Sequence, residues 1–267
     1  MIRAPAVAGR FYPSDPSELS FQVGQCVAPL AEKSPALACI VPHAGYMYSG
    51  PVAGAVYERL QLPRRLLLLG PRHFPKGDPL AIFPSGAWST PLGNAPIDEA
   101  LASDLCREFP RLRDDPEAHA SEHSLEVQVP FLQQLVGDFR FVPIVLGTDR
   151  FPVLEELGHA VARVVGAQTD PILIVCSSDM NHYESDELTR RKDRLAIDRI
   201  LALDARGLYD TVRSYGISMC GYAPAVVTVT AAAELGAKGA ELVRYATSGD
   251  VTGDRREVVG YAGLIIR

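Results

Sequence analysis

The order of apolar and polar positions along the chain predicts alternating strands and helices. Short, continuous apolar runs occur at 37–41, 66–69 and 172–175, and such runs are typical of strands buried on both faces of a sheet. Further strands are expected at 80–83, 139–146, 242–246 and 258–266. Longer segments with helical spacing of apolar residues predict helices at 52–60, 97–109, 121–136, 151–165, 188–203, 205–215 and 224–235.

Local signals place further boundaries. Asp15 and Pro16 have the form of an N-cap and first helical residue, which predicts a helix that runs to about Pro29. Pro130 predicts a kink within the helix at 121–136. The segment 86–96 and the polar stretch around Ser248 are expected to be loops. Strands and helices alternate with no linker, so the pattern predicts one α/β domain, residues 1–267, with a central, largely parallel or mixed sheet flanked by helices.

Polar, ligand-capable side chains follow three of the predicted strands. His43 and His73 each come just after an apolar run, and the third run leads to Asp179 and His182. The carboxyl ends of parallel strands share one edge of a sheet, where ligands bind in open α/β folds. A single histidine in such a place is usually an ordinary loop residue, but three occurrences at the same topological position predict a site.

Cys220 is a candidate to join these residues. It precedes the predicted helix at 224–235, whose N-terminus would stabilise a thiolate and lower the pKa of the thiol. Two imidazoles and one thiolate suit iron(II), copper or zinc rather than magnesium or calcium. The other four cysteines lie in apolar patterns and are interpreted as core residues.

Other residues near these motifs are open to two interpretations. His123 and Glu126 are spaced i, i+3 on a predicted helix, so they either support the site together or are ordinary surface residues. Ser178 beside Asp179 and His182 invites a hydrolase interpretation, but the motif of a nucleophile elbow is absent and loop capping is the alternative. Tyr46 could line a pocket or serve packing.

Composition narrows the class of protein. The chain has 267 residues and a net charge of −6 without a cluster of Lys and Arg, which argues against a nucleic-acid partner. No apolar run approaches the roughly 20 residues that span a bilayer. Five scattered cysteines without a CxxC motif predict free thiols. A soluble, cytoplasmic protein without a signal peptide is therefore expected.

Several ordered motifs together resemble the Memo family, whose prokaryotic members are called AmmeMemoRadiSam system protein B. The motifs are Ala8-Gly9-Arg10-Phe11-Tyr12-Pro13, Pro42-His43-Ala44-Gly45-Tyr46, Gly70-Pro71-Arg72-His73, Glu122-His123-Ser124-Leu125-Glu126, Ser177-Ser178-Asp179 with His182, Cys220-Gly221 and Ser248-Gly249-Asp250. The resemblance covers essentially the whole chain. It implies a fold similar to class III extradiol ring-cleaving dioxygenases, which use non-haem iron(II).

The resemblance also implies roles for individual residues. The positions that match His43, His73 and Cys220 form the family's metal site, with iron or copper. Asp179 and His182 match neighbouring pocket residues, and in the dioxygenases the equivalent histidine acts as an acid or base. We expect Asp179 and His182 to manage protons here, and His123, Glu126, Tyr46 and Ser178 to support the pocket. The sequence has Phe74 and Gln128 where animal members carry further histidines. Ring-cleaving dioxygenases use two histidines and a carboxylate, so a thiolate at the third position means that catechol cleavage does not carry over.

Three functions follow as hypotheses. The first is a metal-dependent redox protein with iron(II) or copper. The second is a module that binds a peptide, an unknown small molecule or the partners implied by the system name, which are AMMECR-like and radical SAM proteins. The third is a zinc hydrolase with the same ligands and an open position for water.

Overall fold

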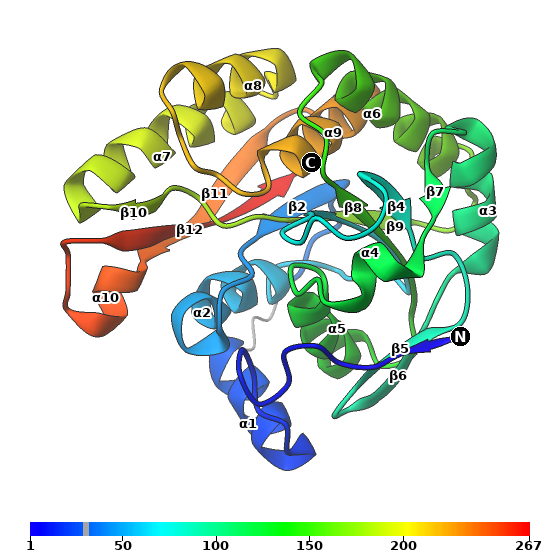
Figure 1. Ribbon diagram of the computed structural model, residues 1–267, viewed down its shortest axis with the longest axis horizontal. Coiled ribbons are helices and arrows are strands. Elements are labelled where there is room, and N and C mark those ends of the chain that lie inside the picture. Colours follow the sequence, from blue (N-terminus) through cyan, green and yellow to red (C-terminus); the bar gives the residue numbers. More distant parts are fainter. Residues whose placement is uncertain (29–31) are drawn as a thin grey trace.

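The apolar runs form the centre of a mixed sheet (Figure 1). The computed structural model describes residues 1–28 and 32–267, and in that part of the chain the sheet has nine strands. Its four central strands are β2 (Ala38–Val41), β9 (Ile172–Ser177), β3 (Arg65–Pro71) and β8 (Arg140–Leu146), in this spatial order and all parallel. Their carboxyl ends therefore meet at one edge, as the sequence predicted.

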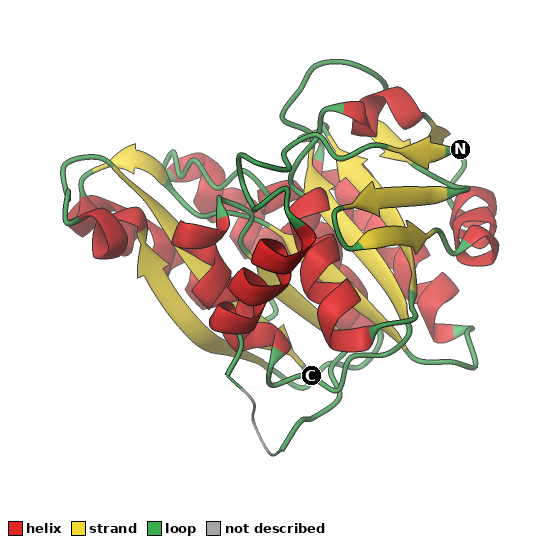
Figure 2. Ribbon diagram, turned by 90° about the horizontal axis from the view of Figure 1, so that it is seen from below, coloured by secondary structure: helices red, strands yellow, loops and turns green. Residues whose placement is uncertain are grey.

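Side chains of the central strands alternate between two apolar layers. Leu67 and Leu69 of β3 face one core, whereas Leu66 and Leu68 face the other. The first core is closed by α3 (Glu99–Glu108), α6 (Phe151–Gly166), α7 (Asp186–Leu201), α8 (Ala205–Ser214) and α9 (Tyr222–Glu234). The second is closed by α1 (Pro16–Cys26), α2 (Tyr46–Tyr57) and α5 (Val129–Val136). Helices lie on both sides of the sheet (Figure 2), and burial of the side chains on both faces explains why these strands are continuously apolar.

Antiparallel strands extend the sheet on both sides. On one side β12 (Val258–Ile266) pairs with β2 and carries β10 (His182–Glu184) and β11 (Ala240–Thr247). On the other, β4 (Leu80–Ile82) pairs antiparallel with β8 and parallel with β7 (Arg113–Asp114). No helix of the described residues is both long and apolar enough to cross a membrane.

Two predicted loops are wrong because they contain regular structure. The segment 86–96 forms a hairpin of β5 (Ala87–Thr90) and β6 (Gly93–Pro96), to which β1 (Ile2–Arg3) adds a third strand. The turn after β11 contains α10 (Ser248–Thr252). Pairing with β1 supports the hairpin, whereas α10 begins at a local capping box formed by Thr247 and Asp250.

Three helix boundaries also differ from prediction. The helix expected at 52–60 begins at Tyr46 and includes Pro51. Its first N–H, that of Tyr46, donates to the carbonyl of Phe11 (2.8 Å), and this contact supports the earlier start. The predicted helix at 121–136 is broken: short α4 (Pro116–Ala120) precedes a loop, and 3₁₀ helix η1 (Glu126–Gln128) leads into α5, where Pro130 occupies the first turn without a kink. The N-cap at Asp15 is confirmed, but α1 ends at Cys26, and Pro29 lies outside the described residues.

Candidate metal centre

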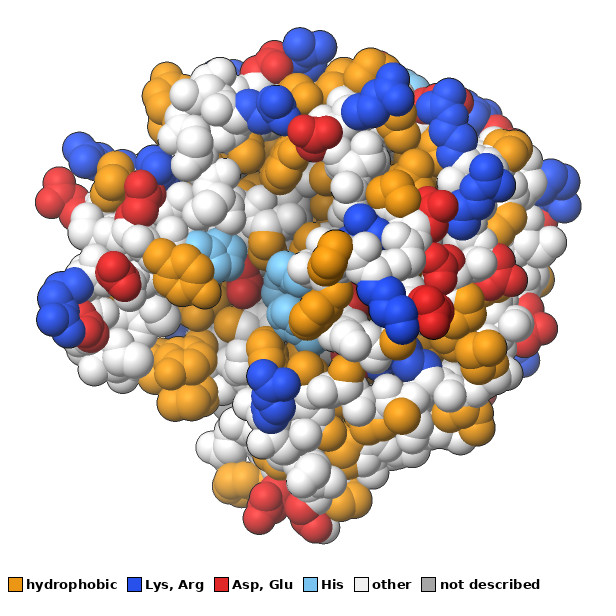
Figure 3. All heavy atoms as spheres, in the orientation of Figure 1, with side chains coloured by type: hydrophobic (Ala, Val, Ile, Leu, Met, Phe, Trp, Pro, Cys, Tyr) orange, Lys and Arg blue, Asp and Glu red, His pale blue; other side chains and the backbone are white. Residues whose placement is uncertain are grey.

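Three central strands each deliver one polar residue to the same cavity. His43, His73 and Asp179 lie two residues beyond the ends of β2, β3 and β9 respectively. They line a cavity of about 700 Å³, which Figure 3 shows as a hollow with histidine side chains on both sides of a carboxylate. The predicted convergence at the carboxyl edge is thus present in the structure.

The hydrogen bonds around His43 fix the tautomer of its ring. Ser177 Oγ donates its only proton to the carbonyl of Ser124 (2.6 Å), so it accepts from His43 Nδ1 at 2.9 Å. Nε2 of His43 then carries a lone pair, and it lies 3.2 Å from the Cys220 sulfur. Burial, together with nearby His73, lowers the pKa of His43 to about 3. The imidazole is therefore neutral and able to act as a ligand.

Glu122 orients His73. One carboxylate oxygen accepts from the backbone N–H of His73 (2.5 Å), and the other accepts from its Nδ1 (2.9 Å) and from the N–H of Ser124 (2.9 Å). Burial opposes the charge on Glu122, but these hydrogen bonds and the charge on His73 lower its pKa to about 2. For His73, burial would lower the pKa, whereas Glu122 outweighs it and raises the pKa. Nδ1 keeps its proton for Glu122, so Nε2 is the nitrogen that a metal would bind, once the charged ring has lost its Nε2 proton.

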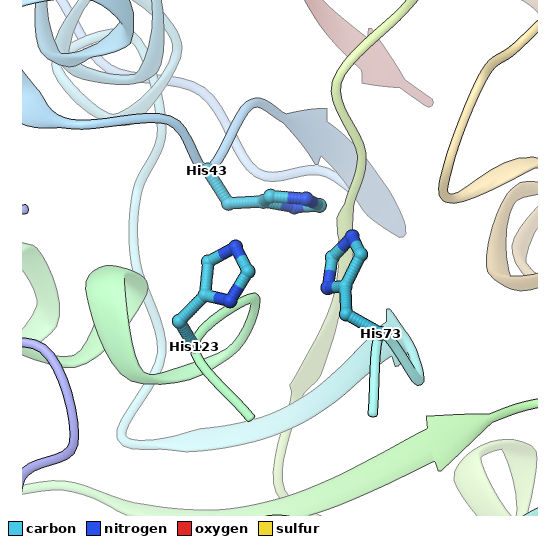
Figure 4. A group of neighbouring side chains, drawn as sticks. All are labelled: His43, His73 and His123. Carbon is cyan, nitrogen blue, oxygen red and sulfur yellow. The ribbon is translucent and has the colours of Figure 1, made fainter. Parts of the chain in front are cut away.

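His123 completes a group of three imidazoles. One donor atom from each of His43, His73 and His123 can be chosen so that all three lie within 4.8 Å of one another. Figure 4 shows the rings arranged around a common space. The His123 ring stacks on that of His73, with centroids 4.6 Å apart, and meets the His43 ring edge-on at 5.6 Å. Burial and His43 lower the pKa of His123 to about 4, which leaves this ring neutral as well.

Cys220 lies beside His43 in the same cavity, just ahead of α9. The backbone N–H of Asp179 donates to its sulfur at 3.3 Å. The expected lowering of its pKa is wrong for the protein without a metal: burial, reinforced by Asp179, raises the pKa of the thiol well above its ordinary value. A bound cation is what would make the thiolate favourable here.

Gly221 and Ser178 hold the Cys220 segment against β9. The N–H of Gly221 donates to Ser178 Oγ (3.0 Å). A Cβ on Gly221 would lie 2.4 Å from Ser178 Cβ and 2.6 Å from the carbonyl oxygen of Ser177, so only glycine fits without a shift of the backbone. Ser178 therefore supports the loop and is buried behind the cavity rather than exposed in it.

Asp179 and His182 face the cavity from the side of β10. Asp179 Oδ1 accepts from the N–H of His43 (2.7 Å), and burial raises the pKa of this carboxyl. Nδ1 of His182 donates to the carbonyl of Ser218 (2.8 Å), which leaves Nε2 available. Both residues can accept or deliver a proton in the cavity beside the histidine cluster.

Two predicted supporting residues lie elsewhere. The shared helical face of His123 and Glu126 is wrong, because His123 is in a loop and Glu126 in η1 points away from the cavity. Glu126 forms a buried ion pair with Arg3 (2.7 Å) and accepts from the hydroxyl of Tyr12 (2.6 Å). Tyr46 is buried, donates to the carbonyl of Val127 (2.6 Å) and does not line the cavity.

Sequence reasoning missed Glu122 and two aromatic residues of the cavity wall, Tyr183 and Tyr261. Glu122 was visible only as the neighbour of His123, and nothing in its spacing distinguished it from Glu126. Phe11, Tyr48, Tyr183 and Tyr261 line the cavity, and among the residues that the structure describes no Lys or Arg lines it. Tyr183 is 73% exposed at a φ of +59°, a left-handed conformation that is strained for a tyrosine.

Comparisons with known proteins agree over nearly the whole length. The family model described as "Memo-like protein" matches residues 3–265. MEMO1 family proteins of Methanopyrus kandleri and Aquifex aeolicus are each 41% identical, over 100% and 99% of this chain and 99% and 98% of their own. One of Pyrobaculum aerophilum is 43% identical over 99% of this chain and 98% of its own.

A solved structure supports the fold. An uncharacterized protein from Escherichia coli K12 superposes with a TM-score of 0.55 over 84% of this chain and 98% of that chain, at 14% identity, which is evidence for the shared fold alone. Family-model coverage and the identities to relatives decide the classification. The chain belongs to the family of Memo-like proteins.

Proposed function

We propose that the protein binds a redox-active transition metal, iron(II) or copper, through His43, His73 and Cys220. The observation that carries the proposal is the lone pair of His43 Nε2, which the Ser177 hydrogen bond directs toward the Cys220 sulfur at 3.2 Å. His73 contributes a second Nε2 whose ring is held from behind by buried Glu122. This carboxylate–imidazole arrangement is the usual support of a metal-ligating histidine.

The chemistry of the donor set fits such an ion. Imidazole nitrogen and thiolate sulfur are borderline and soft donors, which favour iron, copper and zinc over magnesium and calcium. His43 is neutral, so binding there requires no proton loss. Cys220 must lose its proton, and a cation beside the sulfur stabilises the resulting thiolate.

The surrounding residues would serve a substrate bound in the cavity. When bound, the metal supplies electron transfer or activation of a coordinated molecule. Asp179 and His182 are placed to hold or move a proton, since both face the cavity beside the cluster. The aromatic wall and the absence of lining Lys and Arg favour a substrate without strongly anionic groups.

Anaerobic purification followed by elemental analysis tests the metal site. We expect about one iron or copper per chain in the wild type, and loss of most of it in His43→Ala and Cys220→Ser. His159→Ala is the matched control, because His159 is on α6 with its side chain 47% exposed and lies outside the cavity. Absence of stoichiometric transition metal from the wild type would reject the proposal.

Reconstitution distinguishes the redox proposal from a zinc hydrolase. The iron- and zinc-loaded proteins would be compared for oxygen consumption and for hydrolysis of ester and peptide substrates. We expect the iron form to consume oxygen with a reductant and the zinc form to be inactive in both assays. Hydrolysis by the zinc form alone would favour the hydrolase.

A partner-binding role is a second candidate, favoured by the exposed and strained Tyr183 at the cavity. The partners would be AMMECR-like and radical SAM proteins. A pull-down of these partners with wild type and with His43→Ala/His73→Ala tests it. If the variant still binds the partners, partner binding does not depend on the metal site. If only the wild type binds them, the two functions share this site.

A further inference from the structure

His123 has the position of a ligand but no assigned role in the metal centre described above. Its side chain is 17% exposed, and that exposure is toward the cavity it lines. The ring lies between that of Phe11, with centroids 4.7 Å apart, and that of His73. Aromatic contacts on both sides limit rotation of the ring, so its nitrogens keep their direction toward the space in Figure 4.

The ring nitrogens of His123 are not engaged elsewhere. The nearest carboxylate oxygen, from Glu122, is 3.7 Å from Nδ1, which is too long for a hydrogen bond. Within residues 1–28 and 32–267 no hydrogen bond to the ring of His123 is found, whereas His43 and His73 each have one partner that fixes Nδ1. A half-buried, neutral imidazole whose one ring lone pair has no hydrogen-bond partner, beside two other imidazoles, is suited to coordination.

A comparison with His119 shows that an imidazole without hydrogen-bond partners needs other imidazoles nearby to be a candidate ligand. It is fully buried and its ring nitrogens also lack partners, but it is packed against Phe83 and Trp88 and does not line the large cavity. Its surroundings supply no second imidazole to a common centre. His123 differs because two imidazoles offer nitrogens within 4.8 Å of its own.

The spacing is compatible with one ion. Bonds of about 2.0–2.1 Å in tetrahedral geometry place ligand nitrogens about 3.3–3.4 Å apart. The rings would have to approach by about 1.5 Å at most, starting from separations within 4.8 Å. A shift of that size is smaller than a change of rotamer, so it is compatible with ring contacts that keep His123 directed toward the cavity.

We propose that His123 is a third imidazole ligand, so that the centre has three histidines with Cys220 as a further donor. The inference rests on the proposed metal site and adds one ligand to it. It predicts that the metal stays bound by three imidazoles when the sulfur is removed, with weaker affinity. A centre of this kind depends less on thiolate formation than a site of two histidines and one cysteine.

The test combines metal affinity with a spectroscopic count of imidazoles on the loaded protein. Wild type, His123→Gln, Cys220→Ser and His182→Gln would be titrated with Cu²⁺ against a competing chelator. The number of coordinated imidazoles would be measured by X-ray absorption and by paramagnetic resonance. Circular dichroism and thermal unfolding would first establish that each variant is folded.

We expect three imidazoles in the wild type, Cys220→Ser and His182→Gln, and two in His123→Gln, with affinity lowered at least about tenfold in the last. His182→Gln is the matched control because it removes a cavity histidine outside the cluster. Unchanged affinity and imidazole count in folded His123→Gln would overturn this inference while leaving the metal site intact. A wild type that binds no metal would overturn both.

Discussion

Glu122 determines the geometry of the cluster although it does not line the cavity. It accepts three hydrogen bonds, two of them from His73, and a glutamine would place an NH₂ group against one of these donors. We expect Glu122→Gln to weaken metal binding by about 10–100-fold. A chelator competition assay measures this, with exposed Glu117→Gln as the control. Equal affinity in the two variants would show that Glu122 does not position His73.

The second prediction concerns Gly221. Gly221→Ala places a methyl group 2.4 Å from Ser178 Cβ, so the segment that carries Cys220 must move. We expect a loss of about 1–3 kcal/mol in the free energy of unfolding, measured in urea, together with weaker metal binding. Gly239→Ala is the control, because a Cβ there meets nothing within 4 Å. Similar stability of both variants would contradict the close contact.

A single site residue could be predicted from the sequence when it directly follows a buried strand. His43, His73 and Asp179 were predictable as neighbours because each follows a buried strand, and parallel strands bring such positions to one edge. Glu122 was not, because its partner His73 is 49 residues away and the sequence favoured Glu126 on a helix that does not form. The pKa of Cys220 was mispredicted because burial outweighs the helix N-terminus.

At the scale of elements, the segment before α1 is held against η1 by the contacts of Arg3. Arg3 donates to Glu126 and to the carbonyls of His119 and Glu122, all at 2.7 Å, and its guanidinium lies 4.2 Å above the centre of the Trp88 ring. The same segment then carries Phe11 to the ring of His123. The segment from Arg3 to Phe11 therefore links the Arg3–Glu126 ion pair to the histidine cluster.

Removal of one partner of this ion pair should be costly. In Glu126→Ala the buried Arg3 keeps its charge without a counterion, so we expect a loss of about 3–5 kcal/mol in unfolding free energy. Trp88 is the only tryptophan, and its fluorescence in urea reports the loss. Glu241→Ala, which breaks the exposed pairs with Arg59 and Arg267, should cost at most about 1 kcal/mol for each pair. Comparable losses in both would contradict the special role of burial.

Elements buried on both faces were predictable, and those selected by neighbours were not. The runs in β2, β3 and β9 are apolar throughout because two cores contact them. The hairpin β5–β6 contains glycine, asparagine and proline, and it forms through pairing with β1 and packing of Trp88. The beginning of α2 at Tyr46 depends on a hydrogen bond to Phe11, which local sequence does not specify.

For the whole molecule, Asp193 gives stability a distinct pH dependence. It is fully buried, accepts from the hydroxyl of Tyr245 (2.6 Å) and the N–H of Asn181 (2.8 Å), and has Arg190 and Glu184 nearby. Burial raises its pKa from 3.8 to about 7, against the opposing hydrogen bonds. Since the folded state holds this proton more tightly than the unfolded state, its contribution is complete below about pH 4 and is lost as pH rises through 7.

Asp193→Asn should remove this dependence, because asparagine resembles the protonated acid: its Oδ1 can accept from the N–H of Asn181, and its NH₂ can donate to the hydroxyl oxygen of Tyr245. Between pH 4 and 7 we expect the wild type to lose up to about 1.4 kcal/mol per pH unit relative to the variant. Urea unfolding at several pH values measures the difference, with exposed Asp138→Asn as the control. Parallel curves for the wild type and Asp193→Asn would contradict the assignment.

The place of β12 in the sheet has a consequence for biosynthesis. This strand pairs with β2, contributes Val259 and Tyr261 to the cavity, and exchanges backbone hydrogen bonds between Gly260 and the 180–181 turn. More than 200 residues separate it from β2 in the sequence. On the ribosome, His43 and His73 therefore emerge long before the wall that completes their cavity. We expect a nascent chain to acquire the proposed metal only after β12 has left the exit tunnel and closed this wall.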